Sequence, residues 1–322
     1  MVSSNNNGEV SYEFLPFLRI YKDGSVERFL DSPYVPPSLG VSVSSKDVNI
    51  SPHISARIYI PTQLSNTNQK LPILAYFHGG GFCIESAFSF LSHRYINTLV
   101  SQAKVVVISV EYRLAPENPL PMAYEDSWAA LKWIASQSIQ DQIHLKEPWL
   151  LNHADFSRFF VGGDSAGANI AHNISIRATH EGLNNDVKIY GVLLSHPYFL
   201  GSKPIGLEPG FDNDYDKNLL YKTWDFVYPN APGGFDSPLI NPFSNDAPSL
   251  SGLQCSRLLI CVAEKDELRE RGVRYFNAIK KSDWKGKVEL FEVQGEDHCF
   301  QILNLESENA KTMFKRLAAF LN

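Results

Sequence analysis

Ser165 lies in the glycine-flanked segment Gly163–Gly167 (GDSAG), directly after the apolar run Phe159–Val161 and directly before a run with helical spacing. A serine in a sharp turn between a strand and a helix is typical of a nucleophile elbow, which exposes the hydroxyl to a substrate. Glycines let the backbone pack closely there, and the amides that begin the helix attract developing negative charge. The motif predicts a nucleophilic Ser165, although a purely structural glycine-rich turn is the alternative.

A second glycine-rich segment, His78–Phe82 (HGGGF), follows the apolar run Leu71–Phe77. In acyl transfer the substrate carbonyl oxygen becomes an oxyanion, and backbone N–H groups of side-chain-free residues can approach it closely. A phosphate-binding loop is the alternative, but no Gly-Lys-Ser or Gly-Lys-Thr sequence follows. We therefore predict an oxyanion hole formed by the N–H groups of Gly79, Gly80 and Ala166.

An activated serine needs a base within hydrogen-bonding distance and an acid that orients the base. In α/β-hydrolases, whose elbow the Ser165 segment resembles, the chain order is serine, acid, histidine. His298 fits this order because it lies in a loop after the last strand-like run, Val288–Val293. His196 also ends a strand-like run, so it remains an alternative base, although a place in the wall of a substrate pocket suits it better.

Asp266 is the acid that we select, because it follows the strand-like run Arg257–Val262, which precedes the run that leads to His298. Three neighbouring carboxylates compete with it: Glu264, Glu267 and Asp297. The last of these adjoins the histidine in sequence and would rarely reach its Nδ1 atom in the required orientation. A loop carboxylate in a salt bridge is the alternative for Asp266. The predicted triad is therefore Ser165, Asp266 and His298.

Apolar strand-like runs alternate with helical patterns along most of the chain. The runs are Leu71–Phe77, Lys104–Val110, Arg158–Val161, Lys188–Leu194, Arg257–Val262 and Val288–Val293. The helical patterns are Ala87–Gln102, Tyr124–Ser136, Ala166–His180 and Glu267–Ser282. This alternation predicts an α/β fold with a mostly parallel central sheet and helices on both faces. Residues 57–60 are expected to add an antiparallel strand before the parallel set.

Two segments do not follow the alternation: an N-terminal segment, residues 1 to about 45, and an insertion, residues 199 to about 247. The insertion is rich in aromatic residues, among them Trp224. Insertions of this kind often cover a pocket at the carboxyl edge of a sheet. We predict that both segments cap a single domain spanning residues 1–322, with Trp224 and His196 as candidates for substrate contact; ordinary covering loops are the alternative.

The composition is that of a globular protein, with 44% hydrophobic and 20% charged residues among 322. A formal net charge of -6 and scattered Lys and Arg argue against a nucleic-acid partner and favour a small neutral ligand. The four cysteines lack C-x-x-C spacing, and we expect neither a metal nor an organic cofactor. No apolar stretch is long enough to span a membrane and the N-terminus lacks a signal-peptide pattern, so a cytoplasmic location is expected.

Four motifs together resemble the hormone-sensitive-lipase-like family and, within it, the plant carboxylesterases: His78–Phe82, Tyr112–Glu117, Gly163–Gly167 and Gly295–His298. The resemblance covers nearly the whole chain and is closest to the 2-hydroxyisoflavanone dehydratase-like carboxylesterases at residues 21–28, 85–90, 148–155 and 201–206. It implies an α/β-hydrolase fold. In legume dehydratases of this family the elbow resembles GETSG, with threonine at the position of the nucleophile, so the departure at Asp164, Ser165 and Ala166 favours an esterase. The gibberellin receptors of the family lack the triad histidine, which is present here as His298.

These observations predict a carboxylesterase that hydrolyses a small hydrophobic ester through an acyl-serine intermediate. A dehydratase or another lyase on the same scaffold is the main alternative, since one fold supports many reactions. In that case the oxyanion hole would polarise a ketone, and His298 would remove a proton from the adjacent carbon. A non-catalytic small-molecule receptor is a third alternative, which the complete triad disfavours.

Overall fold

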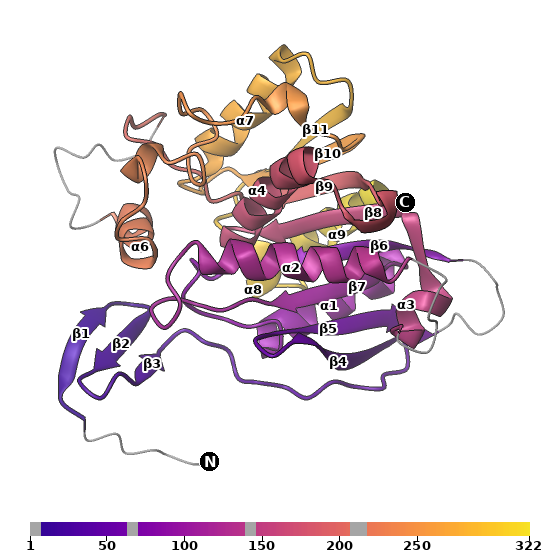
Figure 1. Cartoon of the computed structure of the whole chain (residues 1–322), viewed down its shortest axis with the longest axis horizontal. Helices are drawn as coiled ribbons and strands as arrows, with labels where there is room; N and C mark the ends of the chain where they lie inside the picture. The colour runs from indigo at the N-terminus through magenta and orange to yellow at the C-terminus, as the bar shows by residue number, and fades with distance from the viewer. Residues whose placement is uncertain (1–7, 63–69, 139–145, 207–217) are drawn as a thin grey trace.

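The computed structural model describes residues 8–62, 70–138, 146–206 and 218–322. Its centre is an eight-stranded sheet with the order β11-β10-β9-β8-β6-β7-β5-β4 (Figure 1). The strands are β4 (Val43–Ser51), β5 (Ile54–Pro61), β6 (Leu71–Phe77), β7 (Val106–Glu111), β8 (Ala154–Asp164), β9 (Ile189–Ser195), β10 (Arg257–Ala263) and β11 (Lys287–Val293). Strand β5 is antiparallel to both β7 and β4, and the remaining neighbours are parallel.

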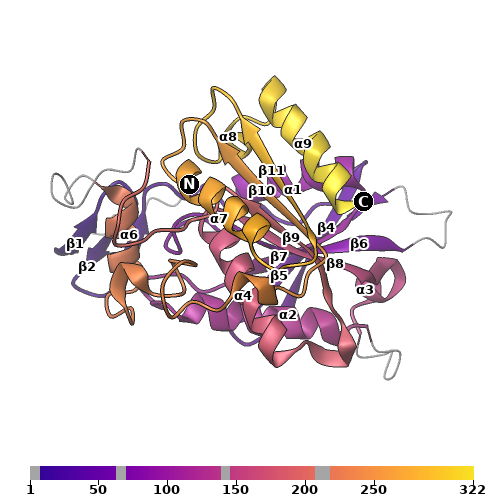
Figure 2. The same ribbon diagram turned by 90° about the horizontal axis from the view of Figure 1, so that it is seen from above.

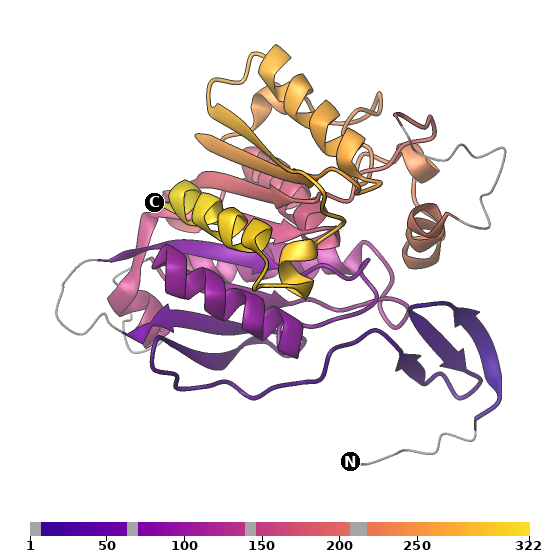
Figure 3. The ribbon, with the colours of Figure 1, turned by 180° about the vertical axis from the view of Figure 1, so that it is seen from behind.

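Helices cover both faces of this sheet, as Figures 1 and 3 show from opposite sides. One face carries α2 (Met122–Ser136), α4 (Ala166–Glu181) and α7 (Arg269–Lys281), and the other carries α1 (Phe90–Ala103), α8 (Phe300–Leu303) and α9 (Glu308–Leu321). Every residue of β6 is buried, as expected for a strand covered on both faces. The predicted α/β architecture, including the antiparallel strand at residues 57–60, is confirmed.

Two long elements of the sheet and its helical layers, β4 and α9, were not predicted from the sequence. Strand β4 lies at the edge of the sheet, where Lys46 and Asp47 are tolerated, and it therefore lacks the continuous apolar run of a central strand. Its first residues, Val43 to Ser45, belong to the central sheet and not to the N-terminal cap in which we had placed them. The second unpredicted element is helix α9, which packs against α1.

A separate antiparallel sheet lies at one end of the molecule, beside helix α6 (Leu219–Val227) of the insertion (Figures 1 and 2). Its strands are β1 (Val10–Phe14), β2 (Leu18–Tyr21) and β3 (Val26–Arg28). Tyr12 and Phe14 stack on Phe226 of α6, with ring centroids 5.8 and 4.5 Å apart. Two segments that are distant in sequence are therefore packed side by side. Residues 1–7 and 207–217 of the predicted cap lie outside the described residues.

The remaining elements are short. Helix α3 (Pro148–His153) precedes β8, and 3-10 helices occur at η3 (Asn184–Asp186), η5 (Gly234–Asp236) and η6 (Leu250–Gly252). In the described part of the chain, no helix combines the length and apolar character that crossing a bilayer requires.

Candidate active site

Ser165 occupies the sharp turn between β8 and α4, as the glycine-flanked motif predicts. Its backbone has φ 52° and ψ -116°, a conformation that non-glycine residues rarely adopt. Close packing enforces this turn. A Cβ atom on Gly167 would lie 1.9 Å from the carbonyl oxygen of Phe77, and one on Gly163 would lie 2.4 Å from the same atom. The Ser165 N–H donates a hydrogen bond of 2.9 Å to the carbonyl of Ser195 on the neighbouring strand, which fixes the turn from the other side.

The structure brings the three predicted triad residues together at the carboxyl edge of the sheet. Asp266 follows β10 and His298 follows β11, and these two strands are neighbours. His298 Nε2 lies 2.9 Å from Ser165 Oγ, and His298 Nδ1 lies 2.7 Å from Asp266 Oδ2. With a proton on Nδ1, His298 donates to Asp266 and accepts from the Ser165 hydroxyl. This is the arrangement that a base needs in order to remove the serine proton.

Asp266 is almost fully buried, and each carboxylate oxygen accepts at least one hydrogen bond. Oδ1 accepts from the Leu268 N–H at 2.9 Å, and Oδ2 faces Nδ1 of both His298 and His196. Burial by itself would raise the pKa of this carboxyl, but the positive charge of protonated His298 and the hydrogen bonds from both histidines outweigh burial. The pKa of Asp266 therefore lies well below its usual range, and the group is ionised at neutral pH.

His298 has the complementary perturbation. Burial lowers the pKa of its imidazole, but the neighbouring Cys299 and the carboxylate of Asp266 more than offset this effect. The pKa of His298 therefore lies well above its usual range. A histidine with a raised pKa is a stronger base when it accepts the serine proton.

The glycine loop after β6 lies next to the buried carboxylate of Asp164, the residue before the serine. Tyr76 donates a hydrogen bond of 2.5 Å to Asp164 Oδ1. Burial raises the pKa of Asp164 to about 6, although the hydrogen bond from Tyr76 acts in the opposite direction. Gly79 lies close to this carboxylate, since a Cβ atom there would lie 2.3 Å from Asp164 Oδ2.

Stacking and hydrogen bonding hold the same loop in place. The ring of His78 stacks on Tyr112 with centroids 4.3 Å apart, and the Tyr112 hydroxyl donates to the His78 carbonyl at 2.7 Å. Gly80 and Gly81 have φ values of 99° and 58°, which favour glycine. Ala166, the predicted oxyanion donor outside this loop, is the first residue of α4, where backbone N–H groups lack partners inside the helix.

A cavity of about 480 Å³ opens directly onto Ser165 and His298. Its apolar wall comes from the N-terminal segment, from the insertion and from the region around α1 and α8. The apolar residues of this wall are Phe17, Leu30, Ile84, Leu91, Leu219, Leu220, Ile302 and Leu303. Gly79, Gly80 and Gly81 also line it. Glu85 is the one carboxylate besides Asp164 among the described lining residues, which include neither Lys nor Arg. The cavity suits a small apolar ligand.

The two residues predicted to contact substrate, Trp224 and His196, do not line this cavity. Trp224 is fully buried on the inner face of α6 and donates from Nε1 to the carbonyl of Gly234 at 3.1 Å. Leu220 and Thr223 take the cavity-facing positions of the same helix instead. His196 is 1% exposed, and its ring contacts the buried Asp266. Both predictions assigned an exposed role to side chains that the structure buries.

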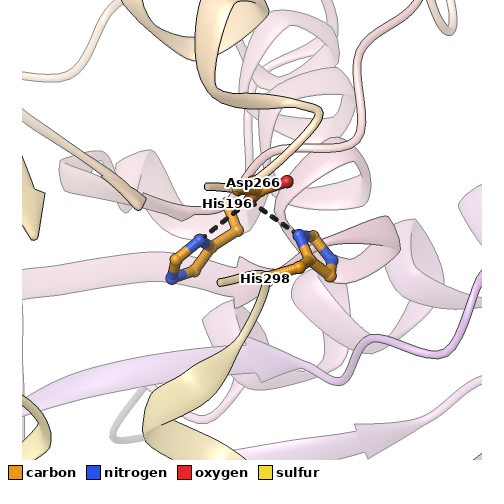
Figure 4. A group of neighbouring side chains, drawn as sticks. All are labelled: His196, Asp266 and His298. Carbon is orange, nitrogen blue, oxygen red and sulfur yellow. Dashed lines mark hydrogen bonds and ion pairs between the residues drawn. The ribbon is translucent and has the colours of Figure 1, made fainter. Parts of the chain in front are cut away.

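His196, Asp266 and His298 are residue types that can also bind a metal ion, and their potential ligand atoms lie within 4.8 Å of one another. Figure 4 shows the two imidazole rings on either side of the carboxylate, each joined to it by a hydrogen bond. A metal at this point would have to replace both N–H donors of a nearly fully buried group. We therefore assign these atoms to hydrogen bonding.

The fold and the elbow agree with the comparison to known families. The family described as "alpha/beta hydrolase fold" matches residues 74–302, a span from β6 to α8 that holds the elbow, Asp266 and His298. The chain belongs to this family. Within this α/β-hydrolase, the glycine loop after β6, the sharp turn at Ser165 and the loop that carries His298 all fall in the matched region.

Similar proteins include enzymes with different named activities. The chain is 53% identical to a 2-hydroxyisoflavanone dehydratase of Glycyrrhiza echinata, over 99% of this chain and 98% of that protein. It is 44% identical to "Probable carboxylesterase 2" of Arabidopsis thaliana, over 98% and 97% of the two chains. Among solved structures, a thermostable carboxylesterase cloned from a metagenomic library has a TM-score of 0.69 at 25% identity, over 89% of this chain and 90% of that one. The predicted resemblance to plant carboxylesterases and dehydratase-like relatives is confirmed.

Proposed function

We propose that this α/β-hydrolase is a serine carboxylesterase that cleaves a small hydrophobic ester. The observation that carries the proposal is the unbroken hydrogen-bond chain from Ser165 through His298 to Asp266, with Ser165 and His298 in the wall of an apolar cavity. A serine hydroxyl is a weak nucleophile until a base removes its proton. The chain supplies that base, and the cavity supplies a place for the ester next to the hydroxyl.

The reaction proceeds in two halves. In the first, Ser165 Oγ attacks the ester carbonyl while His298 Nε2 takes the hydroxyl proton, and the same proton then passes to the departing alcohol. The product is an acyl-serine. In the second half, His298 removes a proton from water, which attacks the acyl group and releases the carboxylic acid. Asp266 keeps the imidazole in the Nδ1–H tautomer and stabilises its protonated form throughout.

The oxyanion of each tetrahedral intermediate needs hydrogen-bond donors that are already in place. We assign this role to the N–H groups of Gly79, Gly80 and Ala166, because the two glycines line the cavity beside Ser165 and Ala166 begins α4. These groups and the triad are sufficient for hydrolysis without a metal or an organic cofactor.

The two segments outside the α/β alternation act as a cap in this proposal. Phe17 and Leu30 come from the N-terminal segment, and Leu219, Leu220 and Thr223 come from the insertion. Together they close an apolar space over the serine. Burial of an acyl or aromatic group there removes apolar surface from water, so the binding free energy should increase with the hydrophobic area of the ester.

The test is mass spectrometry after brief exposure to a fluorophosphonate, combined with turnover of p-nitrophenyl acetate, for wild type and Ser165→Ala. We expect a covalent adduct on wild type and loss of both adduct and turnover in the variant. Ser92→Ala is the matched control, since Ser92 lines the same cavity without contacting His298. Full hydrolysis by Ser165→Ala would refute the proposal.

A dehydratase or related lyase is the second candidate, and the 53% identity to a protein named 2-hydroxyisoflavanone dehydratase favours it. In this reaction the oxyanion donors would polarise a ketone, and His298 would remove the proton from the carbon beside it, so that a hydroxyl leaves as water. No bond to Ser165 forms. The two candidates therefore differ in one result: Ser165→Ala would abolish ester hydrolysis but would only weaken the elimination.

A further inference from the structure

Asp266 is oriented by two histidines and not by the triad histidine alone. Its Oδ2 atom lies 2.7 Å from His298 Nδ1 and 3.0 Å from His196 Nδ1 (Figure 4). The two rings meet Asp266 from different strands, since His196 follows β9 and His298 follows β11, and they cross at 76° with centroids 5.6 Å apart. The ester hydrolysis proposed above uses His298 and leaves the second histidine without a role.

The protonation of His196 follows from its surroundings. It is completely enclosed, and burial lowers its pKa despite the nearby carboxylate. A neutral imidazole carries one N–H, and that proton belongs on Nδ1, which faces the ionised Asp266. The other nitrogen, Nε2, lies 3.1 Å from the side-chain amide of Gln301, whose N–H can donate to it once the amide group is turned. The amide oxygen of Gln301 can then accept from the hydroxyl of Ser195.

The backbone at His196 is built to hold this orientation. Its φ is 49°, in the left-handed region that few non-glycine residues adopt, although Asn, Asp and His are enriched there. The His196 N–H donates 2.8 Å to the carbonyl of Cys261 on β10, the strand that leads to Asp266. Holding a residue in such a conformation costs free energy, and the surrounding structure must supply it. The contact between His196 and Asp266 is thus part of a defined arrangement at the strand ends.

We propose that His196 is a positioning residue, which donates from Nδ1 to Asp266 Oδ2 and so holds the carboxylate in line with the ring of His298. The inference rests on the proposed hydrolysis by Ser165, because the triad gives the positioning its purpose. His196 itself touches neither substrate nor Ser165. Its effect is transmitted through Asp266 to the basicity and orientation of His298.

The charged and titratable groups that face His298 define what a change at His196 should do. They are Asp266 from β10, Asp164 from the end of β8 and Cys299 in the same loop as His298, and His196 acts from β9. If the His196 donor is removed, Asp266 Oδ2 has one hydrogen-bond donor left, and its charge stabilises protonated His298 more strongly. Catalysis needs neutral His298. The acid limb of the profile of kcat/KM against pH should therefore move to higher pH, by about half a unit to one unit.

The experiment compares His196→Asn with His196→Leu. The two side chains have similar shapes, but only Asn keeps a donor near the Nδ1 position, and Asn also tolerates the left-handed backbone. Turnover of p-nitrophenyl acetate is divided by the concentration of active sites, counted with a fluorophosphonate, so that loss of folded protein is separated from loss of rate. We expect His196→Leu to lower kcat about 10- to 100-fold with little change in KM, and to shift the acid limb. His196→Asn should stay within about threefold of wild type.

Two results would overturn the inference: wild-type kcat and pH profile in His196→Leu, or equal losses per active site in both variants. The NMR signal of the His298 Nδ1–H proton, followed through the pH range, reports the same coupling without catalysis. If wild type shows no Ser165-dependent hydrolysis, the proposed function fails, while this titration still decides whether His196 controls His298 through Asp266. An unchanged His298 titration in His196→Leu would refute the coupling itself.

Discussion

Replacement of Asp266 by Asn tests the site at the point where hydrogen-bond donors outnumber acceptors. Three N–H groups face the carboxylate: those of Leu268, His196 and His298. An Asn side chain offers one oxygen and one N–H₂ group. If its oxygen takes the Oδ2 position, the N–H₂ opposes the Leu268 N–H; if it takes the Oδ1 position, the N–H₂ faces both imidazoles, and each must move its proton to Nε2.

The second arrangement is the damaging one, because a proton on His298 Nε2 faces Ser165 Oγ at 2.9 Å and prevents the ring from accepting the serine proton. The first keeps the tautomer but removes the negative charge 2.7 Å from the ring, which stabilises protonated His298 in the transition state. The same carboxylate-to-amide change in a serine protease lowers kcat about 10⁴-fold. We expect a fall of about 10³- to 10⁴-fold, which corresponds to about 4 to 5.5 kcal/mol in activation free energy.

The assay is p-nitrophenyl acetate hydrolysis per folded protein, with Asp297→Asn as the matched control. Asp297 is the neighbouring carboxylate in the histidine loop, and it accepts from the backbone N–H of His298 at 2.7 Å without contacting the ring. We expect the control to stay within about tenfold of wild type. A fall of less than tenfold in folded Asp266→Asn, or an equal fall in both variants, would show that Asp266 does not orient the base.

Three further outcomes are expected. Gly167→Ala should lower the free energy of unfolding in urea by about 3 kcal/mol or more, since its Cβ would lie 1.9 Å from the Phe77 carbonyl oxygen. The control Gly252→Ala, whose Cβ would have no contact closer than 3.9 Å, should change this free energy by about 0.5 kcal/mol at most. Equal effects of the two substitutions would contradict the prediction. The pKa of Asp266 is lower in the folded protein than its ordinary value of 3.8, so the ionised carboxylate stabilises the fold above that pH and this contribution is lost as the pH falls further. Wild type should therefore lose more free energy of unfolding below about pH 4 than Asp266→Asn does. Parallel curves of unfolding free energy against pH for the two proteins would disprove this. A neutral p-nitrophenyl ester should have a kcat/KM at least about tenfold above that of an anionic hemisuccinate ester, since Glu85 lines the described cavity and neither Lys nor Arg does. Glu85→Gln should reduce this difference in kcat/KM, and equal values for the two esters would exclude charge selection.

The residues of the proposed triad could be predicted because each follows an apolar run that becomes a central strand, and carboxyl ends of parallel strands share one edge of the sheet. The contact between His196 and Asp266 could not be predicted in the same way. It depends on β9 lying next to β10, and the order of strands in a sheet is not apparent from their order in the chain. Knowledge of that pairing would have placed His196 beside the acid instead of in the cavity wall.

Other parts of the fold differ in how well they could be predicted from the sequence. Helix α9 carries a clear signal, with Met313, Phe314 and Leu317 on one face and Ser307 as its N-cap, so the pattern alone would have sufficed to predict it. The cavity wall is different. Leu219 and Leu220 face the ligand space while Trp224 of the same helix is buried, and this choice depends on how α6 packs against the small N-terminal sheet. Tertiary packing of that kind leaves no local trace in the sequence.

The stacking of Tyr12 and Phe14 on Phe226 joins the N-terminal segment to the insertion, the two segments that supply much of the cavity wall. The proposed reacting groups lie at the ends of strands of the central sheet, whereas much of the cavity wall comes from the N-terminal segment and the insertion, which pack against each other and against the core. Substitutions at the wall positions of these two segments should therefore change the ligand space more than the proposed triad. To change the range of substrates, by evolution or by protein engineering, these two short segments should therefore be exchanged together as a pair.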